Sequence, residues 1–140
     1  MPAPPSTAMA FDFGERRIGV AVGQTVTRTA QALGIVPARD GNPQWPLITA
    51  YIDEWQPELF VIGRPQHRDG SDHPLDDKIS RFGRRLQGRY NLPVAYIDET
   101  LSSYAAQQHS GQSDELDALA AQLILESWLN QPTPSTTKLT

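Results

Sequence analysis

Residues 8–23 read AMAFDFGERRIGVAVG, two apolar runs on either side of a charged turn. Short apolar runs bounded by a glycine-containing turn predict a β-hairpin, with strands at residues 8–13 and 17–23. Asp12 interrupts the first run. An unpaired carboxylate is costly to bury, so Asp12 needs a cation or hydrogen-bond donors nearby. The hairpin therefore predicts either an ion pair of Asp12 with Arg16 or Arg17, or a metal or catalytic site.

Beyond the hairpin, the apolar pattern alternates between strand and helix spacing. Further strands are predicted at residues 29–37, 58–63 and 92–97, and residues 40–43 predict a turn. Helices are predicted at about residues 47–55, 75–86, 100–108 and 116–130. This order predicts an α/β fold with a five-stranded mixed sheet, in which three antiparallel strands are followed by parallel strands and helices cover both faces.

Size and composition are those of one globular domain. The chain has 140 residues, 39% apolar and 20% charged, with a net charge of −4. We expect one domain over residues 8–130, between disordered ends at residues 1–7 and 131–140. No cysteine is present, which excludes a disulfide, a thiol nucleophile and Cys-ligated zinc and fits a reducing compartment. No apolar run approaches the roughly 20 residues of a membrane helix, so no membrane contact is expected.

Two further acids fall where they could join Asp12. Glu99 follows the last predicted strand, and ligands gather at the carboxyl ends of parallel strands. Asp117 lies in the first turn of the final predicted helix, at the edge of its apolar stripe. Three converging carboxylates repel one another unless a divalent cation lies between them, and an all-oxygen ligand set suits Mg²⁺ or Mn²⁺. Such a site can support hydrolysis of a phosphodiester.

Each of these features also has a simpler interpretation. Asp117 could favour the positive end of a helix dipole, and Glu99 could be a surface acid near a helix start. Ser102 has no evident histidine partner, which leaves helix capping or phosphate contact. Arginines make up most of the basic residues and suit phosphate contact, although a solvated helix face explains the last group equally well. The arginine groups are Arg16/Arg17, Arg64/Arg68 and Arg81/Arg84/Arg85/Arg89.

Four segments in order resemble one known family. They are residues 11–22 (FDFGERRIGVAV), residues 61–65 (VIGRP) with 69–71 (DGS), residues 98–103 (DETLSS) and residues 117–121 (DALAA). Together they resemble the YqgF-type or RuvX-like family of the RNase H-like superfamily, which is linked to Holliday junction resolution and to pre-16S ribosomal RNA processing. The resemblance covers about residues 8–130.

The resemblance implies an RNase H-like fold and a Mg²⁺-dependent (or Mn²⁺-dependent) nuclease in the bacterial cytoplasm. It implies that the catalytic and metal-binding residues are Asp12, Glu99 and Asp117. It also implies that Arg16 and Arg17 contact the phosphate backbone. Arg64 and Ser102 are the other expected substrate contacts. Residues 109–113 form a shorter loop than the lysine-bearing one typical of the family, and we expect this difference to weaken activity.

Three functions are compatible with these features. The first is cleavage of structured RNA, most directly at the 5′ end of precursor 16S ribosomal RNA, with ribosomal precursor particles as partners. The second is resolution of branched DNA, which needs a two-fold dimer to place paired cuts. The third is a non-catalytic module that binds nucleic acid or the ribosome. The sequence is compatible with a monomer or a weak homodimer.

Overall fold

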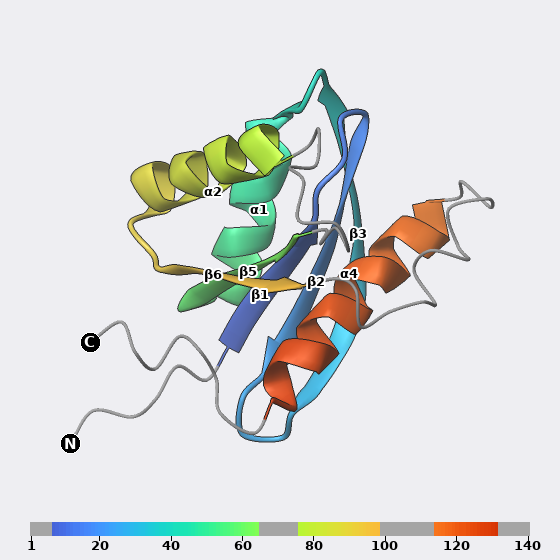
Figure 1. The fold of residues 1–140 in the computed structure, drawn as a ribbon. Coiled ribbons are helices and arrows are strands. Elements are labelled where there is room, and N and C mark those ends of the chain that lie inside the picture. Colours follow the sequence, from blue (N-terminus) through green and yellow to red (C-terminus); the bar gives the residue numbers. More distant parts are fainter. Residues whose placement is uncertain (1–6, 65–75, 99–113, 132–140) are drawn as a thin grey trace.

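The computed structural model of the chain describes residues 7–64, 76–98 and 114–131 (Figure 1). For residues 114–117 it describes the backbone. The strands are β1 (Thr7–Asp12), β2 (Arg17–Gln24), β3 (Thr29–Arg39), β4 (Asn42–Pro43), β5 (Leu59–Arg64) and β6 (Val94–Asp98). The helices are α1 (Trp45–Trp55), α2 (Asp76–Tyr90) and α4 (Asp114–Leu129).

The described strands form one mixed sheet in the order β4-β3-β2-β1-β5-β6. β1 pairs antiparallel with β2 and parallel with β5, and β6 continues the parallel part. The predicted α/β class and the change from antiparallel to parallel pairing are confirmed. The predicted number of strands was wrong, because the structure contains a sixth strand.

The additional strand lies where the sequence predicted only a turn. Asp40 and Gly41 both have positive φ, 53° and 84°, and they make the tight turn. Asn42 and Pro43 then return along β3 and pair with Arg39 and Ala38. A two-residue strand carries no periodicity, so only its pairing with β3 reveals it.

Strand alternation divides β1 between two apolar clusters on opposite faces of the sheet. Met9 and Phe11 point toward α1 and α2, where their cluster includes Phe82. Ala8 and Ala10 point the other way and share a cluster with Leu125 and other residues of α4. Figure 1 shows α1 and α2 on one side of the sheet and α4 across the other. The prediction of helices on both faces is confirmed.

The α4 side is packed closely because its strand residues are small. A Cβ atom on Gly23 would lie 2.9 Å from Cδ2 of Leu125 and 3.1 Å from Cδ1 of Leu129. Ala8 is the cross-strand partner of Gly23, and both residues are buried. Small residues on both strands therefore let the carboxyl-terminal half of α4 approach the sheet backbone.

Several predictions fall outside the described residues. These are the helix at 100–108, the loop at 109–113, the side chains of Glu99 and Ser102, and most of the ends expected to be disordered. None of the helices that the structure describes is long and apolar enough to cross a membrane.

Candidate active site

Asp12 ends the central strand and lies on the α4 side of the sheet. Alternation along β1 gives its side chain the same direction as Ala8 and Ala10, the residues that face α4. The four preceding residues of β1 are fully buried, whereas Asp12 is half-buried. The carboxylate is therefore held on a rigid strand at the point where the sheet begins to open to solvent.

Glycines flank Asp12 in both neighbouring strands. Gly19 of β2 is its cross-strand partner. Phe11 pairs with Ile62 of β5, and the same register carried one residue further puts Gly63 beside Asp12. Neither neighbour has a side chain that could cover the carboxylate, so a ligand can approach it closely.

The turn after Asp12 is shaped by backbone contacts. A Cβ atom on Gly14 would lie 2.6 Å from the carbonyl oxygen of Arg17, so the close approach there requires glycine. The carbonyl oxygen of Arg16 accepts a hydrogen bond from the amide of Ala38, 2.8 Å away, and anchors the turn to β3. Arg16 is exposed. Arg17 is half-buried and, by alternation in β2, lies on the same face of the sheet as Gly19 and Asp12.

α4 carries Asp117 toward the same edge of the sheet. Leu129 packs near Gly23, at the level of Ala8 in β1. Seven residues earlier in α4, Oε1 of Gln122 accepts a hydrogen bond from the amide of Ala32 at 3.1 Å. Ala32, in β3, lies at the level of Ala10 in β1. Ala10 is two residues closer to the carboxyl end of β1 than Ala8 is. α4 therefore runs opposite to β1, and its first turn, where the backbone of Asp117 lies, is at the end of the sheet occupied by Asp12.

β6 ends at this edge too. Its last residue, Asp98, pairs with Arg64 at the end of β5. Ile97 belongs to the apolar cluster under α4, whereas the exposed Asp98 points to the opposite face. Glu99 is the next residue along the chain and lies outside the described part.

Arg64 occupies the opposite face of the sheet from Asp12. Its Nη2 donates a hydrogen bond to Oγ of Ser80 in α2, 3.0 Å away, and its guanidinium lies 4.4 Å from the ring centre of Tyr96. Its Nε is buried and finds no hydrogen-bond partner among the described residues. These contacts join the ends of β5 and β6 to the second turn of α2.

An ion pair that no local sequence pattern predicts joins the charged turn to α2. Nζ of Lys78 donates to Oε2 of Glu15, in the turn between β1 and β2. The two residues are 63 positions apart, so only the packing of α2 against the sheet reveals the pair. The ion pair lies between the start of α2 and the turn that holds Arg16 and Arg17.

Among the residues that the structure describes, no three acidic, histidine or cysteine side chains form a metal-binding group. Of the predicted triad, the side chain of Asp12 alone lies within that part. In the described part of the chain, three features therefore lie at the same edge of the sheet. They are the end of β1 with Asp12, the backbone of Asp117 and the end of β6.

Solved structures share this architecture. The chain aligns with T. thermophilus RuvC in complex with a Holliday junction substrate at a TM-score of 0.56, with 14% identity and 96% coverage of each chain. It aligns with the fowlpox virus Holliday junction resolvase at a TM-score of 0.52 and 16% identity, covering 88% of this chain and 97% of that one. The fold is thus the RNase H-like fold of RuvC-type resolvases.

Sequence relatives define the family more narrowly. Residues 6–131 match the family described as RuvX: Holliday junction resolvase, and the chain belongs to this nuclease family. Two relatives carry the name "Putative pre-16S rRNA nuclease". The protein from Hydrogenovibrio crunogenus is 48% identical over 121 residues, which is 86% of this chain and 90% of the relative. The protein from Saccharophagus degradans is 44% identical over 138 residues, covering 91% and 97%.

Proposed function

We propose that Asp12, Glu99 and Asp117 form one acidic site that holds Mg²⁺ or Mn²⁺ and hydrolyses phosphodiester bonds in structured RNA. The observation that carries the proposal is the position of Asp12. It is the half-buried acid at the end of the central strand, on the face covered by α4 and between two glycines. A strand end of this kind, where sheet and helix diverge, is where α/β folds bind ligands.

Periodicity supports the other two members of the triad. Asp117 precedes Ala121, Ile124 and Trp128 by four, seven and eleven residues, and this spacing defines one stripe of a helix. All three of those residues are buried against the sheet. Glu99 follows Ile97 by two residues, and one more residue of extended chain would give it the direction of Ile97, toward α4.

The chemistry of these donors fits a hard divalent cation. All three proposed ligands are carboxylates, and oxygen is the donor that Mg²⁺ and Mn²⁺ prefer. When bound, such a cation offsets the repulsion between carboxylates and stabilises negative charge developing on the phosphoryl oxygens. Arg17 adds a cation on the same face, and Arg16 an exposed one in the turn. Gly19 and Gly63 leave room for the phosphodiester beside Asp12.

The remaining predicted contacts have separate roles in the proposal. Arg64 positions the start of α2 through its hydrogen bond to Ser80 and stacks on Tyr96 of β6, and its charge lies at the substrate edge. Ser102 is proposed to contact a phosphate oxygen. The shorter loop at residues 109–113 is expected to lower the catalytic rate without abolishing it.

The names of the relatives support a precursor of 16S ribosomal RNA as substrate. The proposal further places the cut near the 5′ end of that RNA, in the cytoplasm and within ribosomal precursor particles. Branched DNA is the second candidate, because the family model is described as a Holliday junction resolvase. That reaction would need a dimer, whereas a monomer suffices for RNA processing.

The test is cleavage of precursor 16S RNA and of a four-way DNA junction, side by side, with Mg²⁺, Mn²⁺ or a chelator. We expect metal-dependent cleavage of the RNA, and loss of cleavage in Asp12→Asn, Glu99→Gln and Asp117→Asn with an unchanged circular dichroism spectrum. Asp114→Asn is the matched control, because Asp114 lies in the same first turn of α4.

Three results would contradict parts of the proposal. Full activity of Asp117→Asn together with loss in Asp114→Asn would replace Asp117 by Asp114. Preferential cleavage of the junction would assign branched DNA as the substrate. Binding of either substrate without cleavage would make the chain a non-catalytic module.

A further inference from the structure

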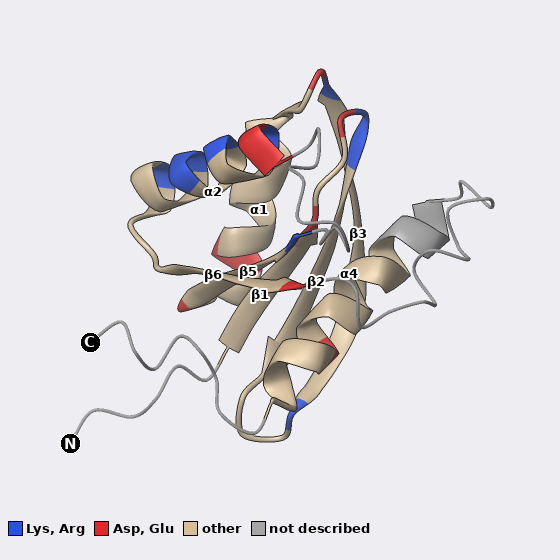
Figure 2. Cartoon of the chain, in the orientation of Figure 1, with Lys and Arg blue, Asp and Glu red and all other residues tan. Residues whose placement is uncertain are grey.

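α2 carries an unusual concentration of positive charge on its solvent side. Between residues 78 and 90 the chain has five basic residues and no acidic one, in a protein whose net charge is −4. We call Lys78, Arg81, Arg84, Arg85 and Arg89 the basic stripe. Figure 2 shows the stripe as blue bands along the helix. Exposed helices more often alternate charges at positions i and i+4, which stabilises them, whereas like charges at that spacing repel.

None of these basic residues is among the residues of α2 that face the sheet. Ile79, Phe82, Gly83 and Leu86 face the sheet, and they leave the basic residues on the remaining arc of the helix. Arg81, Arg84 and Arg89 are exposed. Within the described part of the chain, Arg81 and Arg84 have no carboxylate partner, so their charges are not offset by an ion pair there.

Two other arginines are held by neutral groups. Nη1 of Arg85 donates to Oδ1 of Asn42, 2.7 Å away. The guanidinium of Arg89 stacks 4.1 Å from the ring centre of Trp45. Both contacts fix the orientation of a guanidinium and leave its charge in place. Arginines fixed in this way lose less conformational freedom when they bind an anion.

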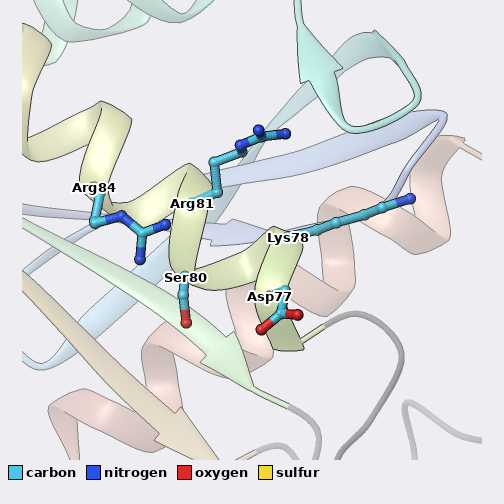
Figure 3. Close-up of a pocket in the computed structure, with 5 residues that line it drawn as sticks. All are labelled: Asp77, Lys78, Ser80, Arg81 and Arg84. Atoms are coloured by element: carbon cyan, nitrogen blue, oxygen red, sulfur yellow. The ribbon is translucent and has the colours of Figure 1, made fainter.

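A pocket lies at the start of the stripe. It has a volume of about 370 Å³ and is lined by Asp77, Lys78, Ser80, Arg81 and Arg84 (Figure 3). Figure 3 shows the long side chains of Lys78, Arg81 and Arg84 projecting from successive turns of α2. The same Ser80 accepts the hydrogen bond from Arg64 at the end of β5, so the pocket adjoins the edge of the sheet where Asp12 lies.

α2 starts near the edge of the sheet where Asp12 lies and runs away from that edge. Ser80 contacts Arg64 at the carboxyl end of β5, and the ring of Tyr90 lies 6.0 Å from that of Phe60 near its amino end. α2 therefore runs antiparallel to β5. At 1.5 Å per residue, the stripe extends about 16 Å. One strand of B-form DNA presents a phosphate about every 3.4 Å along the axis, so this length spans roughly four or five phosphates of such a duplex.

We propose that the basic stripe of α2 binds the phosphate backbone of a duplex arm that extends from the active site. The inference rests on the proposed nuclease function and adds a second contact surface, outside the acidic site and on the opposite side of the sheet from α4. The contact is to phosphates alone, so it follows the shape of a duplex and not its sequence.

The test is equilibrium binding in chelator, where cleavage does not occur, with two labelled hairpins that differ by about ten base pairs of stem, one helical turn. Each hairpin is made as RNA and as DNA, to show which duplex the stripe prefers. We expect the wild type to bind the longer hairpin about tenfold more tightly. The double variant Arg81→Gln/Arg84→Gln should lose this gain, and its salt-dependence slope should fall by about 0.9 for each phosphate contact removed.

The control is Arg28→Gln. Arg28 is exposed in the turn between β2 and β3, at the other end of the sheet, and its removal changes the net charge in the same sense. We expect this variant to keep the wild-type length effect and salt slope. Equal salt slopes for the double variant and the wild type, or no gain from the longer stem in the wild type, would overturn the inference.

The design separates this inference from the proposed function. Cleavage of the short hairpin in Mg²⁺ depends on the acidic site, so the double variant should cleave it at the wild-type rate while Asp12→Asn does not. A wild type that shows the stem-length effect but cleaves nothing would retain the inference and reject the metal-dependent activity.

Discussion

Asp12 is an acidic residue at the end of an otherwise apolar strand, and this position favours the proposed metal site. Its neighbours in β1 are fully buried, and its partners in the adjacent strands are glycines. The sequence reveals the unusual acid and both glycines. It cannot show that Gly19 and Gly63 flank the carboxylate, because that arrangement depends on the register of β1 with β2 and β5.

The proposed metal site predicts a thermal effect that does not depend on catalysis. A ligand that binds the folded state stabilises it by RT ln(1 + [L]/Kd), about 2.7 kcal/mol at 100 times Kd. We expect Mg²⁺ to raise the melting temperature of the wild type and to have little effect on Asp12→Asn. Differential scanning calorimetry with and without Mg²⁺ measures this.

Asp40→Asn is the matched control for that measurement. Asp40 is exposed in the turn between β3 and β4 with φ 53°, a backbone conformation that asparagine adopts readily. Its melting temperature should respond to Mg²⁺ as that of the wild type does. An equal response in Asp12→Asn would show that Asp12 does not bind the metal.

At the scale of the elements, the packing of α2 against the sheet requires one of its two glycines and not the other. A Cβ atom on Gly83 would lie 2.1 Å from Oη of Tyr96, whereas one on Gly88 would meet nothing within 4 Å. Gly83 thus lets α2 pack against β6, and Tyr96 in turn stacks on Arg64 at the edge of the site. Gly88 has no such packing role.

The two glycines therefore predict opposite effects of alanine. Gly83→Ala should lower the free energy of unfolding by about 1–3 kcal/mol, because the added methyl group overpacks the interface. Gly88→Ala should raise the free energy of unfolding by roughly 0.5–1 kcal/mol, because alanine has a higher helix propensity than glycine at an exposed position. Urea denaturation of both variants measures the difference.

A double variant tests the cause of the first effect. Adding Tyr96→Phe to Gly83→Ala removes the hydroxyl group that the methyl group would meet, and should recover part of the lost stability. Similar losses of stability in Gly83→Ala and Gly88→Ala would contradict the packing argument.

The order of the elements could be predicted because each long element carries its own periodicity. The β1–β2 hairpin, the buried strand β5 and the helix with Asp117 in its first turn all follow from local patterns. β4 could not be predicted, since two residues have no period. The face occupied by Arg64 could not be predicted either, because its partners Ser80 and Tyr96 are distant in the sequence.

For the molecule as a whole, most of the described basic residues lie on α2 or near one edge of the sheet. Figure 2 shows basic positions along α2 and at the turn between β1 and β2. The ion pair between Glu15 and Lys78 joins these two regions. A nucleic acid at Asp12 would therefore meet arginines on both sides of the sheet edge, although the chain as a whole is acidic. Binding should accordingly weaken as salt rises.

The most direct test of the account is the single-turnover rate of precursor 16S RNA cleavage in Mg²⁺, for the wild type and for Asp12→Asn. The account predicts metal-dependent cleavage by the wild type and a loss of roughly 10³-fold or more in the variant, because several kcal/mol of charge stabilisation disappear with the metal. Equal rates for the two proteins, or wild-type cleavage that persists in chelator, would contradict it.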